Sequence, residues 1–356
     1  MIPVTKPFLP PIEEYQKYVS DIWDRNWLTN NGPLVQQLEK KLRDYLGVEH
    51  IFFMGNGTVA IQIGLKSLGI KKQVITTPFS YVATTSSILW EGCTPVFADI
   101  NESDLNINVD KIEQAITADT EAILATHVYG NPCDVNAISV LAQKYNLKVI
   151  YDGAHAFGTV FNGKSLLAYG DIATCSFHAT KVFHTTEGGA IICHDKELAD
   201  KIFLQRSFGH LGDDHFAVGI NGKNSEFHAA MGLCNFNYVE EIINSRKIIT
   251  NNYNHLLHPS LQRPVALPGT DYNYAYYPVI LPNEEVLNNV VLKLNKADIF
   301  PRRYFYPSLN TLSYLTEKKP CPVAENFSLR VLSLPLYVGL QEEEIEKISE
   351  IINSCI

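Results

Sequence analysis

The stretch Ser176-Phe177-His178-Ala179-Thr180-Lys181 ends an apolar run that begins at Ile172, and Glu187-Gly188-Gly189-Ala190 follows shortly after. A run of this kind predicts a buried strand, and the glycines let backbone approach backbone closely in the following turn. Burying an ammonium is costly, so desolvation should lower the pKa of Lys181, and an unprotonated amine attacks aldehydes. A lysine that holds pyridoxal phosphate (PLP) as a Schiff base needs this property, although a lone lysine after a strand is usually a solvated surface residue.

Strands and helices alternate on both sides of this stretch. The predicted strands cover 74–77, 95–99, 122–126, 148–152, 172–177 and 189–193, and the predicted helices between them cover 82–91, 108–117, 133–145 and 195–207. Short β-branched runs separated by helices predict an α/β fold with a mostly parallel sheet covered on both faces. Ligands bind such sheets at the carboxyl ends of the strands, so polar residues there are the candidates for a site.

Asp152 ends the predicted strand 148–152. An aspartate at the end of a buried strand needs a cationic partner, and the protonated pyridine nitrogen of PLP would be one. That pair would keep the ring able to accept electrons. His155 would hydrogen-bond the ring hydroxyl of the cofactor or the Asp152 side chain. The alternative for Asp152 is a helix N-cap or a structural salt bridge.

Three further features lie at predicted strand ends. Gly55-Asn56-Gly57-Thr58 opens a helix to about Leu68, and the free N–H groups at such a start bind phosphate well, although a plain N-cap explains the motif too. Tyr81 would stack on a planar ring or fill the core. His127 would line the pocket or be structural, and no second ligand at metal spacing accompanies it.

The sequence pattern of the rest of the chain predicts helices before the sheet and a smaller α/β unit after it. Amphipathic patterns predict helices over 9–26 and 34–46, and Ser225 marks another helix start. A long helix over about 236–258 leads to a strand near 274–281, a helix near 284–296 and a terminal helix from about 341. We expect a large domain over 1–240 and a small C-terminal domain over 241–356.

Composition excludes several classes of function. The 356 residues carry a net charge of −9, which disfavours binding to nucleic acid or to an anionic membrane. No apolar stretch is long enough for a membrane span, and the first residues lack the pattern of a signal peptide. The seven cysteines form no Cys-x-x-Cys pair, which favours reduced thiols in a cytoplasmic protein.

With these residues in hand, the chain resembles the DegT/DnrJ/EryC1/StrS family of sugar aminotransferases over nearly its whole length. The resemblance implies a fold-type I PLP aminotransferase, related in fold to aspartate aminotransferase, with a mostly parallel mixed sheet in its large domain. Its marks are Asn30-Asn31-Gly32-Pro33, Gly57-Thr58-Val59-Ala60, Asp152-x-Ala154-His155-Ala156-x-Gly158, the two stretches around Lys181 quoted above, and Leu334-Pro335-Leu336-Tyr337.

The resemblance also implies roles for individual residues. Lys181 resembles the Schiff-base lysine and proton shuttle, and Asp152 the partner of the pyridine nitrogen. Asn221 matches an asparagine that reaches the phosphate of the neighbouring subunit's cofactor, which implies a homodimer. The phosphate of the cofactor would contact Gly57, Thr58 and Ser176, and its ring would contact Tyr81. The other implied cofactor contacts are His155 and His178. The implied substrate contacts are Asn30, Lys223, Arg302, Arg303 and Tyr306.

Three departures from the family pattern bear on the substrate. His155 replaces a common Gln, Gly222-Lys223 replaces a common Tyr-Arg, and Phe305-Tyr306 replaces a common His-Tyr. These variants resemble a subgroup that acts on dTDP-keto-6-deoxyhexoses.

Two other stretches, Ile2-Pro3-Val4-Thr5-Lys6-Pro7 and Trp27-Leu28-Thr29-Asn30-Asn31-Gly32-Pro33, are most similar to those of C4 aminotransferases. That resemblance implies amino transfer from L-glutamate to C4, giving dTDP-4-amino-4,6-dideoxyglucose for a surface polysaccharide such as O-antigen. The sequence leaves UDP open as the nucleotide in place of dTDP. Transfer to C3 and a non-catalytic PLP-binding regulator are the alternatives, whereas a related dehydratase has histidine where Lys181 stands.

Overall fold

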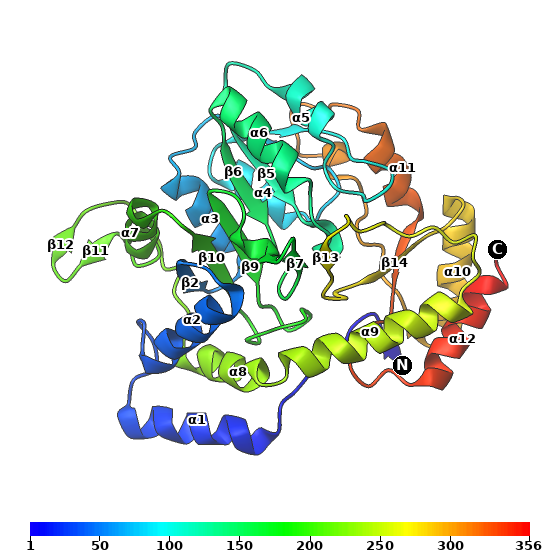
Figure 1. The fold of residues 1–356 in the computed structure, drawn as a ribbon, viewed down its shortest axis with the longest axis horizontal. Coiled ribbons are helices and arrows are strands. Elements are labelled where there is room, and N and C mark those ends of the chain that lie inside the picture. Colours follow the sequence, from blue (N-terminus) through cyan, green and yellow to red (C-terminus); the bar gives the residue numbers. More distant parts are fainter.

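The centre of the molecule is a seven-stranded sheet, which the computed structural model describes together with the rest of residues 1–356 (Figure 1). The strand β10 is antiparallel to both of its neighbours, and every other pair is parallel. The predicted α/β fold with a mostly parallel mixed sheet is therefore confirmed. The strands, in spatial order, are β2 (His50–Met54), β10 (Gly189–Cys193), β9 (Ile172–Ser176), β6 (Lys148–Asp152), β5 (Thr120–Thr126), β3 (Gln73–Thr76) and β4 (Thr94–Phe97).

Helices cover both faces of this sheet. Alternate residues of a strand point to opposite faces, so Ile123 and Ala125 of β5 join one apolar cluster and Ala122 and Leu124 join another. The first face packs against α2 (Pro33–Leu46), α5 (Val109–Ala115), α6 (Val135–Tyr145) and α8 (Glu226–Phe236). The second face packs against α3 (Gly57–Ser67), α4 (Ala83–Trp90) and α7 (Lys196–Gln205).

The N-terminal helix α1 (Ile12–Arg25) runs beside α8 at the bottom of the view, and the long α9 (Val239–Leu256) continues from α8 towards the right (Figure 1). Ser225 caps α8, because its hydroxyl accepts a hydrogen bond from the His228 N–H at 3.4 Å, as the sequence predicted. The predicted long helix is α9.

The C-terminal part has its own apolar cluster, built on α9 and on the antiparallel pair β14 (Tyr277–Ile280) and β16 (Val331–Leu334). Its helices are α10 (Glu284–Lys296), α11 (Pro322–Arg330) and α12 (Glu342–Asn353). Strand β1 (Ile2–Pro3) pairs in parallel with β15 (Ile299–Phe300), so the first residues of the chain join the last hundred. The proposed boundary at residue 240 stays a prediction.

Short elements complete the chain. A three-stranded sheet contains β13 (Thr270–Asp271), β7 (Val160–Phe161) and β8 (Lys164–Ser165), and a hairpin contains β11 (His210–Leu211) and β12 (Asp214–His215). Single 3-10 turns occur at Val128–Gly130, Leu166–Ala168 and Leu309–Thr311. None of the helices has both the length and the apolar character needed to cross a bilayer. The sequence analysis missed β2, α11 and β16, which have only four to nine residues and show no extended periodic pattern.

One apolar cluster joins the C-terminal part to the strand ends of the sheet. Phe79 and Tyr129 lie next to β3 and β5, and they pack against Phe305, with Phe327 in the same cluster. The ring of Phe305 stacks on Tyr129 with centroids 5.7 Å apart. This packing places the segment around Arg302 over the carboxyl ends of the strands.

Candidate active site

A cavity of about 400 Å³ lies at the carboxyl ends of the central strands. Its walls come from the start of α3, the segment after β3, the ends of β6 and β9 with the turns that follow them, and two segments of the C-terminal part. The cavity therefore lies at the edge of the sheet where the strand-end rule predicts a site. Nine predicted site residues line the cavity: Gly57, Thr58, Tyr81, Asp152, His155, Ser176, His178, Lys181 and Arg302.

Lys181 lies on a tight turn that follows β9. Its N–H donates to the carbonyl of His178 at 2.9 Å, and the Phe177 N–H donates to the carbonyl of Gly188 at 2.8 Å, which closes the loop. The side chain is partly buried, and Nζ donates to the hydroxyl of Tyr276 at 3.3 Å. The turn and this hydrogen bond hold the amine inside the cavity.

The charge state of Lys181 differs from the sequence-based expectation. Burial acts to lower the pKa of its amine, but the Tyr276 phenol, the Asp152 carboxylate and Tyr304 outweigh burial and raise the pKa above the usual value. The expectation of a lowered pKa is therefore wrong for the protein by itself. The reason is that the fold buries the amine together with a carboxylate and hydroxyls, which favour the ammonium form.

Asp152 is the buried carboxylate of the cavity, with 4% of its surface exposed. Its Oδ2 accepts from the Thr84 hydroxyl at 2.7 Å, and its Oδ1 accepts from the Ala154 N–H at 3.1 Å. It takes part in none of the chain's ion pairs. Burial raises the pKa of Asp152, while Thr84, Ala154 and Lys181 act to lower it. The carboxylate can therefore still form an ion pair with a cation of a ligand.

His155 forms the wall beside Asp152. Its ring is parallel to that of Phe305, with centroids 5.6 Å apart, and it meets the Tyr276 ring edge-on at 4.8 Å. Burial, assisted by Lys181, holds the pKa of His155 well below its usual value, so the ring is neutral. The buried Nδ1 has no hydrogen-bond partner in the protein. An orphaned nitrogen in a cavity wall fits a polar group of a ligand.

The start of α3 forms another wall. The side chain of Asn56 caps the helix by accepting from the Val59 N–H at 2.8 Å, which leaves the N–H groups of Gly57 and Thr58 without partners. A Cβ at Gly189 would lie 2.5 Å from the carbonyl carbon of Asn56, so only glycine lets β10 approach the helix start this closely. Free N–H groups at a helix N-terminus bind phosphate.

These four features fit PLP. The cofactor presents an aldehyde, a basic ring nitrogen, a ring hydroxyl and a phosphate. The cavity offers, in the same order, the amine of Lys181, the unpaired carboxylate of Asp152, the orphaned nitrogen of His155 and the free N–H groups of α3. A metal is not indicated, because no group of three or more His, Cys, Asp or Glu residues could hold one.

Two neighbouring arginines lie in different surroundings. The guanidinium of Arg302 lines the cavity over the Tyr304 ring, and no carboxylate pairs with it. The guanidinium of Arg303 turns away, donates to Glu284 at 3.0 Å and covers the ring of Tyr306. Of the two arginines that the sequence left open, Arg302 faces the cavity.

Three more predicted residues lie outside the cavity of their own chain. Asn221 is exposed and forms a backbone bridge with Ser207. Lys223 lies over the ring of Phe208, and burial, assisted by the positive charge of Arg206, lowers its pKa. The loop that carries Asn30 is exposed at that residue. Their predicted contacts with cofactor or substrate stay predictions.

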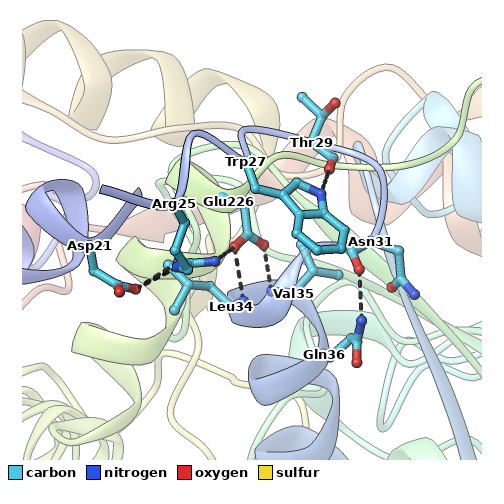
Figure 2. A network of polar contacts seen from close by, with 9 residues as sticks. All are labelled: Asp21, Arg25, Trp27, Thr29, Asn31, Leu34, Val35, Gln36 and Glu226. Carbon is cyan, nitrogen blue, oxygen red and sulfur yellow. Dashed lines mark hydrogen bonds and ion pairs between the residues drawn. The ribbon is translucent and has the colours of Figure 1, made fainter. Parts of the chain in front are cut away.

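A buried carboxylate explains the local structure next to Asn30 (Figure 2). The fully buried Glu226 accepts from the N–H groups of Leu34 at 3.0 Å and Val35 at 2.9 Å, and it pairs with Arg25 at 3.2 Å. It thereby caps the start of α2 from the start of α8. A Cβ at Gly32 would lie 2.6 Å from this carboxyl group, which explains the glycine in the Asn30-Asn31-Gly32-Pro33 motif.

Sequence reasoning missed four residues of the site. Tyr276, Tyr304 and Glu187 line the cavity, and Thr84 binds Asp152. Tyr304 lies in the aromatic and basic stretch around Arg302, and Glu187 in the glycine motif, so both had a sequence signal. Tyr276 is 95 residues from Lys181 and had none.

Comparisons with known proteins agree with this geometry. A family model described as "DegT/DnrJ/EryC1/StrS aminotransferase family" matches residues 11–353. A "dTDP-4-amino-4,6-dideoxy-D-glucose transaminase" from Shigella dysenteriae is 43% identical, over 97% of this chain and 96% of that protein. One of the same name from Escherichia coli is 40% identical, over 99% and 98%. The structure of DesI "in the presence of its TDP-sugar product" matches with a TM-score of 0.93 and 29% identity, over 99% of this chain and 92% of that one.

Proposed function

We propose that this chain, which belongs to the DegT/DnrJ/EryC1/StrS aminotransferase family, uses PLP to transfer the amino group of L-glutamate to a dTDP-4-keto-6-deoxyhexose. The product would be dTDP-4-amino-4,6-dideoxyglucose, the compound in the names of the Shigella and Escherichia relatives, for a surface polysaccharide such as O-antigen. The predicted family and the fold-type I architecture are confirmed.

One observation carries the proposal. The cavity holds both the amine of Lys181 and the buried carboxylate of Asp152, which forms no ion pair in the protein. When bound, PLP supplies a ring that accepts electrons from a carbon losing its proton. Asp152 would keep a proton on the ring nitrogen. Lys181, the one lysine that lines the cavity, would hold the aldehyde carbon and carry the moving proton on Nζ.

The remaining residues of the site would bind and orient. The start of α3, with Thr58 and Ser176, would hold the phosphate, His155 would hold the ring hydroxyl, and Tyr81 would cover the ring. Arg302 would bind an anionic group of the substrate, and the diphosphate of the nucleotide sugar is the group we assign to it. These donors matter because the chain as a whole is negative.

We also propose a homodimer, in which Asn221 and Lys223 act in the site of the partner subunit. Both residues lie outside the cavity of their own chain, which supports this arrangement. The seven cysteines are free and six are buried, which supports a reducing compartment such as the cytoplasm.

Borohydride reduction tests the covalent role of Lys181. Protein loaded with PLP should show a visible absorption band that borohydride abolishes, and the Lys181 peptide should gain the mass of the reduced cofactor. Lys181→Ala should lose both the mass gain and transamination, whereas Lys201→Ala, on the exposed side of α7, should keep them. Turnover of glutamate by Lys181→Ala at the native rate would overturn the proposal.

The product tests the substrate assignment. Incubation with dTDP-4-keto-6-deoxyglucose and L-glutamate should give a sugar whose amine NMR places on C4. An amine on C3 would contradict the C4 assignment and favour a C3 aminotransferase. If glutamate left the absorption of the PLP-loaded protein unchanged, the chain would instead be a non-catalytic PLP-binding regulator.

A further inference from the structure

The segment Tyr272–Tyr276 links β13 to β14 and passes along the wall of the cavity. We call it the strap. It has no regular secondary structure, yet it carries Tyr276, whose hydroxyl accepts from Lys181. The contacts on either side of Tyr276 show how firmly the strap is held.

The first half of the strap is tied to the large part of the molecule. The hydroxyl of Tyr272 donates to the carbonyl of Tyr129 at 2.6 Å. The buried Asn273 donates to the carbonyls of His155 at 2.7 Å and Phe157 at 2.8 Å. These bonds connect the strap to the segment that places the His155 ring in the cavity wall.

The second half is tied to α9 by Arg246. Its guanidinium is 3% exposed and has no carboxylate partner, and it donates to the carbonyls of Ala275 at 3.1 Å and Tyr274 at 3.4 Å. Burial lowers the pKa of Arg246 to about 10. Tyr274 adopts a φ of 52°, which is uncommon for a residue with a side chain. Because a buried unpaired cation and a left-handed residue are both unfavourable, the fold holds this conformation at a cost.

The result is one fixed position for Tyr276. Its ring meets His155 edge-on at 4.8 Å and Tyr304 at 5.6 Å, so the hydroxyl has little freedom to leave Lys181. The other titratable groups that interact with the amine are Asp152 on β6, His155 after it, Cys175 on β9, and Tyr304 near Arg302. None of these groups hydrogen-bonds Nζ, whereas Tyr276 does.

We infer that Tyr276 is a positioning residue for Lys181, held by the strap so that its hydroxyl keeps the amine in one place whether or not the amine carries a proton. A hydroxyl can accept a hydrogen bond from an ammonium and donate one to a neutral amine. A base that gains and loses a proton during turnover needs a partner of this kind. The inference rests on the proposed function for its catalytic meaning, but the contact itself belongs to the protein without cofactor.

The test uses cofactor-free protein and the variant Tyr276→Phe, which removes only the hydroxyl. Tyr274→Phe is the matched control, because its hydroxyl lies on the same strap and forms no hydrogen bond in the protein. The measured quantity is the rate of trace acetylation of Lys181 at mildly alkaline pH, determined by peptide mass spectrometry relative to the exposed Lys201.

Because Tyr276 contributes to raising the pKa of Lys181, its loss should lower that pKa and make acetylation several-fold faster. The control should match the native protein. In PLP-loaded enzyme, Tyr276→Phe should lower kcat by about 10-fold with little change in the KM for glutamate, because a misplaced base slows proton transfer.

An unchanged acetylation rate in Tyr276→Phe, or an equal change in Tyr274→Phe, would overturn the inference. Either result would leave the proposed function standing, because borohydride trapping tests that function separately. Melting curves of both variants check that they are folded.

Discussion

Two buried carboxylates show how differently one chain treats the same chemical group. Glu226 is 0% exposed and has three donors, the N–H groups of Leu34 and Val35 and the guanidinium of Arg25. Asp152 is 4% exposed and has two donors, neither of them charged. Glu226 is paired with a cation in direct contact, whereas Asp152 forms no ion pair and interacts with Lys181 only over a longer distance.

On the proposed function, the difference separates a structural carboxylate from one that binds the cofactor. A buried charge with a complete set of partners holds two elements together, here α2 and α8 (Figure 2). A buried charge with an incomplete set is unfavourable unless a ligand completes it. Many residues lie at a strand end, but few buried charges there lack an ion-pair partner. The missing partner is therefore the more specific sign of a ligand site.

The largest expected effect comes from Asp152→Asn. The amide cannot keep a proton on a ring nitrogen, so kcat should fall by on the order of 10³-fold, as measured by steady-state transamination. Thermal stability of the cofactor-free protein should be unchanged or higher, because an unpaired buried charge is removed. A variant that lost stability but kept its activity would assign Asp152 to the structural class with Glu226.

Glu226→Gln should lower the stability of the protein and leave cofactor binding unchanged. One of the two N–H groups at the start of α2 would face the amide NH₂, and Arg25 would lose its charged partner, so the free energy of unfolding should fall by about 3 kcal/mol. Urea denaturation measures this change. The control is Asp44→Asn, which breaks the exposed pair with Lys40 and should change stability little. Borohydride trapping of PLP at native efficiency is expected in both variants.

The two arginines extend the comparison to cations. Arg302 has no carboxylate partner and faces the cavity, whereas Arg303 pairs with Glu284. Arg302→Met should raise the KM for the nucleotide sugar about 10-fold through the loss of a charged hydrogen bond. Arg303→Met should leave that KM nearly unchanged. Equal changes of this KM in the two variants would show that the unpaired guanidinium of Arg302 does not bind the nucleotide sugar.

The smallest expected effect is a pH dependence of stability. Burial raises the pKa of Asp152 above its value in the unfolded chain, so the folded state binds this proton more tightly. Stability of the cofactor-free protein should therefore decline, through this group, as pH rises from the unfolded pKa through the folded one, and stay level above it. The free energy of unfolding of the native protein minus that of the Asp152→Asn variant, measured by denaturation at several acidic pH values, isolates this decline. This difference should be largest at low pH and fall as pH rises, and a difference that rose with pH would contradict the sign.

Sequence reasoning worked where a local rule applies. The strand and helix periodicities located most elements of the sheet layer, and the rule of strand carboxyl ends brought Asp152 and Lys181 to one edge. It failed for the pKa of Lys181, because that pKa depends on Tyr276 and Tyr304, which reach the amine only through the packing of the C-terminal part. It could not choose between Arg302 and Arg303, since adjacent residues share one sequence context.

The order of apolar, polar and glycine residues along the chain by itself determined the α/β class, the edge of the sheet that carries the site, and the lysine and aspartate placed there. Those features depend on near neighbours, which a sequence displays directly. Only the tertiary structure decided which charges remain without partners, which arginine faces the cavity and which tyrosine holds the amine. Such outcomes depend on contacts between residues as far apart as Leu34 and Glu226, and whether a buried charge is satisfied is known only when all of its neighbours are in place.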